Sequence, residues 1–341
     1  PSSRLAPDGE AWALQPAGIR LHPVGLSSDD IASIAELVEV ADAAPELDRS
    51  ALGEHTLVGT DEAAVNEPSG PSVAAAVGGG VGPGDRPAPE PEHSLVVTLL
   101  GGITVIDRDG DQVDFERSKT RELVAWLATH RARSTRSAAR AALWELDVRD
   151  ATFANVVSEA RRSLARLVEP PEGEEWVGRT MTDALPLHEL VVTDADLVEH
   201  ALEVARVQPP AQAIATLTPA VELIAGVPFE GTSYLWPDGE GITSNLVLLA
   251  TTATTELAAH CLSVGDIQGV FAATGRGLQV LPGHEELIAL RMEAHARAGD
   301  HAGVRHEWES YERVINHDPW SDGEPAPKLV ELRRRLLQPS R

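Results

Sequence analysis

The sequence is poor in cysteine, in aromatic residues and in long apolar runs, and each shortage excludes a class of protein. The single cysteine, Cys261, excludes an intrachain disulfide and favours a reducing compartment. Aromatic residues make up only 4% of the 341 residues, so we expect a core of Ala, Leu and Val in closely packed helices. No unbroken run of 18 apolar residues occurs, which predicts that no segment of the chain contacts or spans a membrane. The length alone predicts about two domains.

Motifs of enzymes and metal sites are also missing. The three His-Glu pairs lack the second histidine of a zinc-protease helix, and Ser118-Lys119-Thr120 lacks the glycine of a phosphate-binding loop. Gly80-x-Gly82-x-Gly84 lies among further Gly and Pro instead of between a strand and a helix. Cys261 sits within an apolar helical pattern, where a small buried residue is expected. We therefore predict no enzyme activity, no cofactor and no metal.

Charge is distributed unevenly along this acidic chain, whose formal net charge is −25. Residues 1–93 carry a net charge of −12, residues 94–193 carry −3, and residues 194–341 carry −10. Within the middle block, residues 117–166 hold 11 cationic and 5 acidic side chains. Because the bulk charge repels nucleic acid, any nucleic-acid binding must use a focused basic face in this segment.

The composition of the first block, residues 1–93, predicts an acidic and largely disordered linker. Residues 68–92 are so rich in Gly and Pro that they cannot form a packed core. Upstream, Ser27-Ser28-Asp29-Asp30 precedes apolar residues at helical spacing, which predicts one helix over residues 28–41.

The second block, residues 94–193, has the order of a winged helix-turn-helix. Two β-branched runs within 93–115 predict strands, with a turn at Asp109-Gly110. Apolar periodicity then predicts three helices, and a small terminal β-ribbon follows them. The helices are expected over 121–129, 135–144 and 150–167, and the ribbon over 176–193.

The third helix of such a domain enters the major groove of DNA, and its outer face is basic here. Arg161 and Arg162 are candidates for guanine edges or phosphates, and Asn155 for adenine. The alternative interpretation is that these arginines are only solvated side chains on an outer helix face. The apolar pattern around Trp126 and Trp144 predicts that both belong to the core. The full set of predicted DNA-binding residues is Lys119, Arg121, Arg133, Arg136, Arg140, Asn155, Ser158, Arg161, Arg162 and Arg166, with Arg131 as a further backbone contact.

The third block, residues 194–341, is helical and repetitive. Gly265-Asp266-x-x-Gly269-Val270 recurs 34 residues later as Gly299-Asp300-x-x-Gly303-Val304, the period of tetratricopeptide repeats. Helices are expected over 245–263, 267–279, 283–298 and 301–315, with two more across 195–225. Stacked helix pairs offer a surface for proteins or peptides, with a purely structural scaffold as the alternative. The predicted fold is thus mainly α with a small β part.

The ordered motifs of residues 95–340 resemble the winged helix-turn-helix and bacterial transcriptional activation domains of the Streptomyces antibiotic regulatory protein family. The segments that carry the resemblance are Leu99–Gly102, Arg117–Leu127, Ala142–Trp144, Val157–Leu164, Asp194–Leu197, Gly226–Phe229, Tyr234–Trp236, Gly277–Pro282 and Met292–Asp300.

This resemblance implies a cytoplasmic regulator that binds double-stranded promoter DNA, as a homodimer, and recruits RNA polymerase or another protein through its helical repeats. The wing departs from the family pattern, because residues 172–193 hold five acidic side chains against Arg179. A wing of that charge is expected to repel phosphate.

Two further readings follow from the departures. The acidic N-terminal block resembles larger actinobacterial proteins that join this domain pair to a LysM module and membrane helices, so the chain would be the cytoplasmic region of a tethered protein. The alternative function is a signalling scaffold that binds no DNA and works through protein contacts of the repeats.

Overall fold

The computed structural model describes residues 4–8, 11–15, 19–21, 91–144, 148–317 and 323–338. The chain divides into two units, residues 1–79 and residues 80–341. In the first unit, β1 (Arg4–Asp8), β2 (Ala11–Gln15) and β3 (Ile19–Leu21) form an antiparallel sheet in the order β1-β2-β3. The sequence predicted no strand in this segment. The helix predicted over 28–41 lies outside the described residues.

The second unit begins with a three-stranded sheet in the order β5-β4-β6. The strands β4 (Leu95–Thr98) and β5 (Thr104–Asp107) pair antiparallel, and β6 (Val191–Thr193) joins the other edge of β4 in parallel. The turn predicted at Asp109-Gly110 is present, since Gly110 turns with a φ of 87° and Val113 N donates to Val105 O at 2.9 Å.

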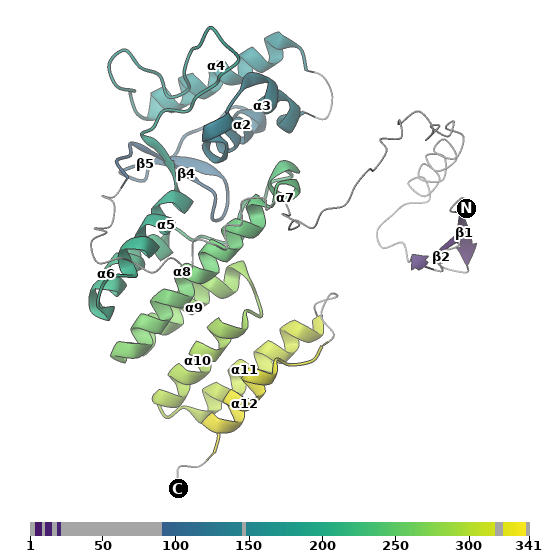
Figure 1. Cartoon of the computed structure of the whole chain (residues 1–341), viewed down its shortest axis with the longest axis vertical. Helices are drawn as coiled ribbons and strands as arrows, with labels where there is room; N and C mark the ends of the chain where they lie inside the picture. The colour runs from purple at the N-terminus through teal and green to yellow at the C-terminus, as the bar shows by residue number, and fades with distance from the viewer. Residues whose placement is uncertain are drawn as a thin grey trace, which may run out of the picture. The chain divides into compact units, whose positions relative to one another are not determined.

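Three helices follow this sheet, as the sequence predicted, and α2 packs against β4, β6 and the other two helices (Figure 1). They are α2 (Ser118–Thr129), α3 (Arg136–Leu143) and α4 (Asp150–Leu167), with the short 3-10 helix η3 (Arg131–Arg133) between α2 and α3. The Thr135 side chain accepts a hydrogen bond from Ala138 N and so caps α3. The apolar stripes of α2 and α4 are buried, which fixes the orientation of the outer face of α4.

The predicted terminal ribbon is only partly present. Val177 and Leu187 form a single antiparallel bridge, while Val191–Thr193 pair with β4 because all three residues are buried beside that strand. We call residues 172–193 the wing. Trp176, at the start of the wing, is 1% exposed and donates from Nε1 to Val168 O at 2.7 Å, which fastens the wing to the end of α4.

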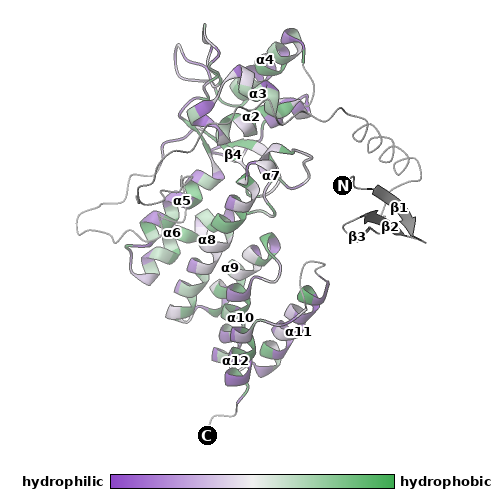
Figure 2. Ribbon diagram, turned by 45° about the vertical axis from the view of Figure 1, so that its right-hand side comes forward, coloured by the Kyte–Doolittle hydropathy of each residue, from purple (hydrophilic) through white to green (hydrophobic). Residues whose placement is uncertain are grey.

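The rest of the chain is a stack of antiparallel helices (Figure 1). The elements are α5 (Asp194–Ala205), α6 (Pro210–Glu222), α7 (Trp236–Gly239), α8 (Ile242–Val264), α9 (Ile267–Val280), α10 (Glu285–Arg297), α11 (His301–His317) and α12 (Pro327–Leu336). Figure 2 shows polar and apolar residues on each helix, as amphipathic packing requires. The sequence did not predict α7 or α12.

The 34-residue repeat has a physical basis in the turns that precede α9 and α11. Gly265 and Gly299 adopt positive φ values of 82° and 75° and end the preceding helices. Asp266 and Asp300 then cap the next helices by accepting from Gly269 N and Gly303 N, each at 2.9 Å. The same backbone geometry thus recurs at the same spacing, which confirms the predicted repeat.

Helix α8 lies within this stack, packed against α6 and α9. It is the one helix of the described residues that is long and apolar enough to cross a membrane by length and composition. It contains no unbroken apolar run of that length, because polar residues such as Asn245 and Glu256 interrupt it. Its buried face, which includes Ala250 and Ala253 at 0% exposure, belongs to the common core, as for a core helix of a helical stack.

Candidate nucleic-acid interface

The outer face of α4 carries a continuous exposed stripe. Its residues follow one another at intervals of three or four, and they are Ala151, Asn155, Ser158, Arg162 and Arg166. The opposite face, from Phe153 to Leu164, is buried, and α4 packs against α2. The stripe contains two arginines and no carboxylate, in a protein whose net charge is −25. We call these five residues the α4 stripe.

The two arginines of the α4 stripe make only peripheral contacts. Arg162 Nε lies 3.4 Å from Ser158 O of its own helix. Arg166 donates to Ser163 Oγ at 3.2 Å and lies 3.7 Å from a carboxylate oxygen of Glu116, with 61% of its side chain exposed. Arg166 Nε also lies 3.4 Å from Arg162 O, yet both side chains remain exposed on the stripe.

Arg161, which the sequence placed beside Arg162 as a base or phosphate contact, lies off the α4 stripe. Its Nε donates to Val177 O at 2.6 Å, and its Nη2 donates to Gly178 O at 2.8 Å. Its Nε also lies 3.0 Å from Glu175 Oε2, and the side chain is only 17% exposed. Burial lowers the pKa of the guanidinium, while Glu175 opposes that shift. Arg161 thus connects α4 to the wing.

Two other predicted contacts also connect helices within the domain. Lys119 Nζ donates to Leu143 O at 2.5 Å, pairs with Glu122 at 2.7 Å and lies 5.5 Å from the centre of the Trp144 ring. Arg140 pairs with Asp150 and donates to Val148 O. These contacts connect α3 to α2 and α4, so both side chains are engaged within the domain.

The remaining predicted cations differ in exposure. Arg133 is exposed on η3, and Arg136 is half-buried at the start of α3. Arg131 donates to Val191 O, and burial lowers the pKa of its guanidinium. Arg121 is hydrogen-bonded to Tyr234; burial raises the pKa of the Tyr234 hydroxyl, and Arg121 opposes the rise.

The acidic wing is largely neutralised by contacts within the domain. Glu175 pairs with Arg179 at 2.7 Å and with Arg161 at 3.0 Å. Glu174 lies 2.5 Å from His188 Nε2, and Asp183 accepts from Ser137 N at 3.2 Å. Glu172 and Glu189 are exposed and form no ion pair among the described residues. The sequence could not show these partners, because they come from other elements.

The winged helix and the helical repeats are joined by backbone hydrogen bonds around one buried carboxylate. Asp194, at 1% exposure, accepts from Leu99 N, Leu100 N and Ala195 N, each at 2.9 Å. Leu100 O in turn accepts from Ala225 N at 2.8 Å. Burial raises the pKa of Asp194 to about 7, although the three backbone donors oppose the rise.

Comparison with known proteins assigns the helical repeats. Residues 193–337 match the family model of the bacterial transcriptional activator domain. The chain carries a bacterial transcriptional activator domain. That match confirms the resemblance proposed for the C-terminal part of the sequence, and its first residue lies at the capping box of α5, where Thr193 and Asp196 exchange hydrogen bonds. No curated protein matches the chain.

A solved structure, Mycobacterium tuberculosis EmbR in complex with a low affinity phosphopeptide, shares the fold of this chain. The TM-score is 0.54 at 21% sequence identity, over 72% of this chain. The match spans 65% of the EmbR chain, slightly less than two thirds of its length. The likeness extends beyond the activator domain, which supports the fold predicted from the sequence.

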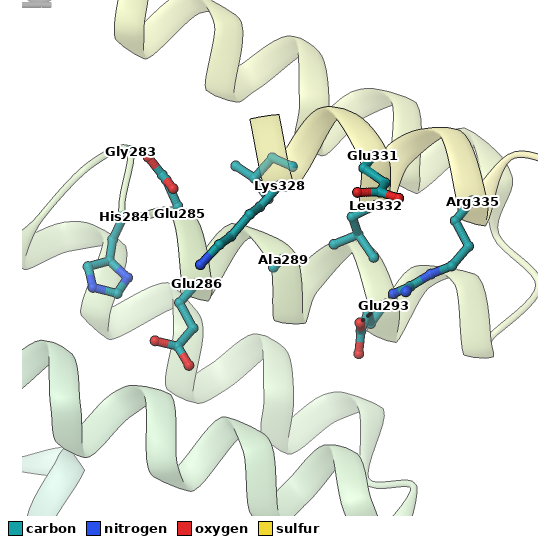
Figure 3. A pocket seen from close by; sticks show the side chains of 11 residues that line it. Gly283, His284, Glu285, Glu286, Ala289, Glu293, Lys328, Glu331, Leu332 and Arg335 are labelled. Atoms are coloured by element: carbon teal, nitrogen blue, oxygen red, sulfur yellow. Dashed lines mark hydrogen bonds and ion pairs between the residues drawn. The ribbon is translucent and has the colours of Figure 1, made fainter. Parts of the chain in front are cut away.

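The activator domain has a groove of about 860 Å³ between α10 and α12 (Figure 3). Leu329 and Leu332 contribute apolar surface, and charged side chains line the sides. Figure 3 shows Lys328 and Arg335 of α12 extending towards α10, and Arg335 pairs with Glu293 at 3.4 Å. This groove lies at the C-terminal end of the stack, whereas α4 belongs to the winged helix.

Among the described residues, no group of three or more His, Cys, Asp and Glu side chains is placed to hold a metal ion. Cys261 is 2% exposed within α8, as expected for a small apolar residue, and burial raises the pKa of its thiol to about 11.

Proposed function

We propose that the chain is a cytoplasmic, non-enzymatic transcriptional regulator that binds double-stranded promoter DNA through the α4 stripe. The observation that carries the proposal is the composition of the stripe, an exposed helix face with two arginines and no carboxylate in a strongly acidic protein. The activator domain supports a role in transcription. Arg162 and Arg166 bind phosphate or guanine, while Asn155 and Ser158 read base edges.

The activator domain contacts RNA polymerase or another protein in this proposal, and two copies of the chain bind neighbouring half-sites. The α10–α12 groove offers one surface for such a protein contact. Titration of the chain onto a duplex with two half-sites, followed by mass measurement of the complex, tests the dimer. A single copy per duplex at saturation contradicts it.

The experiment that tests DNA binding is selection of duplexes from a random pool by the full chain. Recovered duplexes are then titrated at several salt concentrations, because the slope of log affinity against log salt falls by about 0.9 for each lost phosphate contact. We expect Arg162→Ala to reduce that slope by about 0.9 if Arg162 binds phosphate. Arg305→Ala, an exposed arginine on α11, is the matched control and leaves the slope unchanged.

A second candidate function rests on the groove. If no duplex is enriched at any salt concentration, the DNA-binding proposal fails, and a scaffold that acts through protein contacts of the activator domain remains.

A further inference from the structure

The wing presents an electrostatic conflict with the proposed function. Residues 172–193 hold five acidic side chains and Arg179 as the single Lys or Arg, yet the wing lies next to the helix that we propose to bind DNA. If the carboxylates simply repelled phosphate, each would weaken DNA binding. The structure gives three of them, Glu174, Glu175 and Asp183, a different environment.

Glu175 lies between two arginines that come from different parts of the domain. Arg161 projects from α4, and Arg179 belongs to the wing itself. The Arg161 guanidinium also donates to Val177 O and Gly178 O, so one side chain ties α4 to the first strand-like segment of the wing at three points. A planar group with several fixed donors suits this arrangement, whereas a lysine could not reproduce it.

Asp183 fixes the other side of the wing. Its carboxylate accepts from the backbone N and hydroxyl of Ser137, and its carbonyl oxygen accepts from Arg136 N at 2.7 Å. These donors belong to the first turn of α3, where a negative charge is stabilised by the helix dipole. Leu185 N donates to Ser134 O at 2.9 Å and adds a further contact on that side.

Resting on the proposed function, we infer that Arg161 and Glu175 are positioning residues for DNA binding. They hold the wing against α4, so that the wing and the α4 stripe approach one DNA duplex in a fixed relative orientation. We call the contacts of Arg161 with Glu175, Val177 and Gly178 the wing clamp. The carboxylate of Glu175 acts through Arg161, and neither side chain contacts DNA.

The wing clamp predicts that removing the Glu175 carboxylate changes DNA affinity in the opposite direction from removing a carboxylate that only repels phosphate. Removing a carboxylate that only repels phosphate strengthens DNA binding, whereas removing Glu175 releases Arg161 and weakens it. Glu172 provides the matched control, because it is exposed on the same segment and forms no ion pair among the described residues. Glu172→Gln and Glu175→Gln therefore remove the same charge from neighbouring places with opposite expected results.

The first measurement is amide hydrogen exchange of the full chain without DNA. We expect residues 177–187 to exchange faster in Glu175→Gln and in Arg161→Ala than in the wild type, and Glu172→Gln to match the wild type. Unchanged exchange in both clamp variants overturns the wing clamp. This readout does not depend on DNA, so it decides the clamp even if the chain binds no duplex and the proposed function fails.

The second measurement is the affinity of the same variants for a duplex selected by the wild-type chain. Loss of one charge-assisted contact predicts binding weaker by roughly tenfold for Glu175→Gln and Arg161→Ala. Stoichiometric titration gives the active fraction and so separates lost affinity from lost folded protein. We expect Arg161→Lys to recover only part of the affinity, since it keeps the charge without the planar donors.

The salt dependence distinguishes positioning from direct contact. A positioning role leaves the slope of log affinity against log salt unchanged in Arg161→Ala, whereas a direct phosphate contact lowers it by about 0.9. A reduced slope in Arg161→Ala, or tighter binding by Glu175→Gln, overturns the inference while leaving DNA binding itself established.

Discussion

Two glycines of α9 allow a sharp test of the helix packing in the activator domain. A Cβ atom on Gly275 would meet no atom within 4 Å, whereas one on Gly277 would lie 2.5 Å from Leu287 Cδ1 and closer still to Thr254 Oγ1. Both neighbours are fully buried, and the Thr254 hydroxyl is held by hydrogen bonds to Ala250 O and Thr251 O at 2.9 and 3.0 Å. They therefore cannot move aside without loss of packing.

The expected effects have opposite signs. Gly275→Ala gains about 1 kcal/mol of helix propensity. Gly277→Ala gains the same propensity but overpacks the contact of α9 with α8 and α10, at a cost of about 1–3 kcal/mol, so the net change is neutral to about 2 kcal/mol destabilising. For a unit of this size, 1 kcal/mol corresponds to a Tm change of roughly 2–4 °C.

Thermal unfolding of the full chain, followed by circular dichroism at a helical wavelength, measures both variants under one set of conditions. We expect Gly275→Ala to unfold about 2–4 °C above the wild type and Gly277→Ala to unfold below Gly275→Ala by at least the same interval. Equal stabilisation by the two substitutions would refute the close approach of α9 to Thr254 and Leu287, and with it the packing of the repeats.

Three other predictions concern single residues. Because the folded pKa of Asp194, about 7, lies above its ordinary value of 3.8, its contribution to stability is present at low pH and is lost as the pH rises through 7. Denaturant titrations from pH 5 to 8 should show a steeper fall for the wild type than for Asp194→Asn, and parallel curves contradict the shift. Asn155→Ala should lose about 1–3 kcal/mol of discrimination at one base pair of a selected duplex, and a uniform loss at all positions contradicts base readout. The raised pKa and burial of Cys261 predict that a thiol reagent modifies it at pH 8 only after unfolding, so rapid labelling of the native chain would contradict its burial.

The secondary structure of residues 94–317 was largely predictable because its signals are local. Apolar periodicity defines α4 to the residue, and the Gly-Asp pairs before α9 and α11 combine a left-handed turn with a helix cap. By contrast, α12 holds only two buried apolar residues, Leu329 and Leu332, among charged ones. A helix that depends on a small tertiary contact with α10 and α11 gives little periodic signal.

The candidate site was only partly predictable, and the pair Arg161 and Arg162 shows why. Neighbouring residues on a helix point about 100° apart, so the two arginines cannot share one face. Both were nevertheless predicted on the DNA-binding face, because the turn of Arg161 towards the wing depends on the position of the wing, which is set by the packing of Trp176 and by the Val177–Leu187 bridge. Those contacts are distant in sequence from α4, and no local pattern encodes them.

The junction of the two domains constrains how any regulatory signal can act. The turn at Leu99–Gly102 exchanges hydrogen bonds with Asp194 and with the backbone of Ala225–Glu230, and Leu100 and Ile224 beside it are fully buried. A hinge motion there would leave several buried backbone groups without partners, at about 1–3 kcal/mol each. A state that lies about 3 kcal/mol above the ground state is populated at about 1%, so a hinge motion that breaks three or more of these bonds is rare. The α4 stripe therefore keeps a fixed orientation relative to α5 and α8, and a signal received by the activator domain must alter partner contacts or the wing, since the angle between the domains is set by the fold.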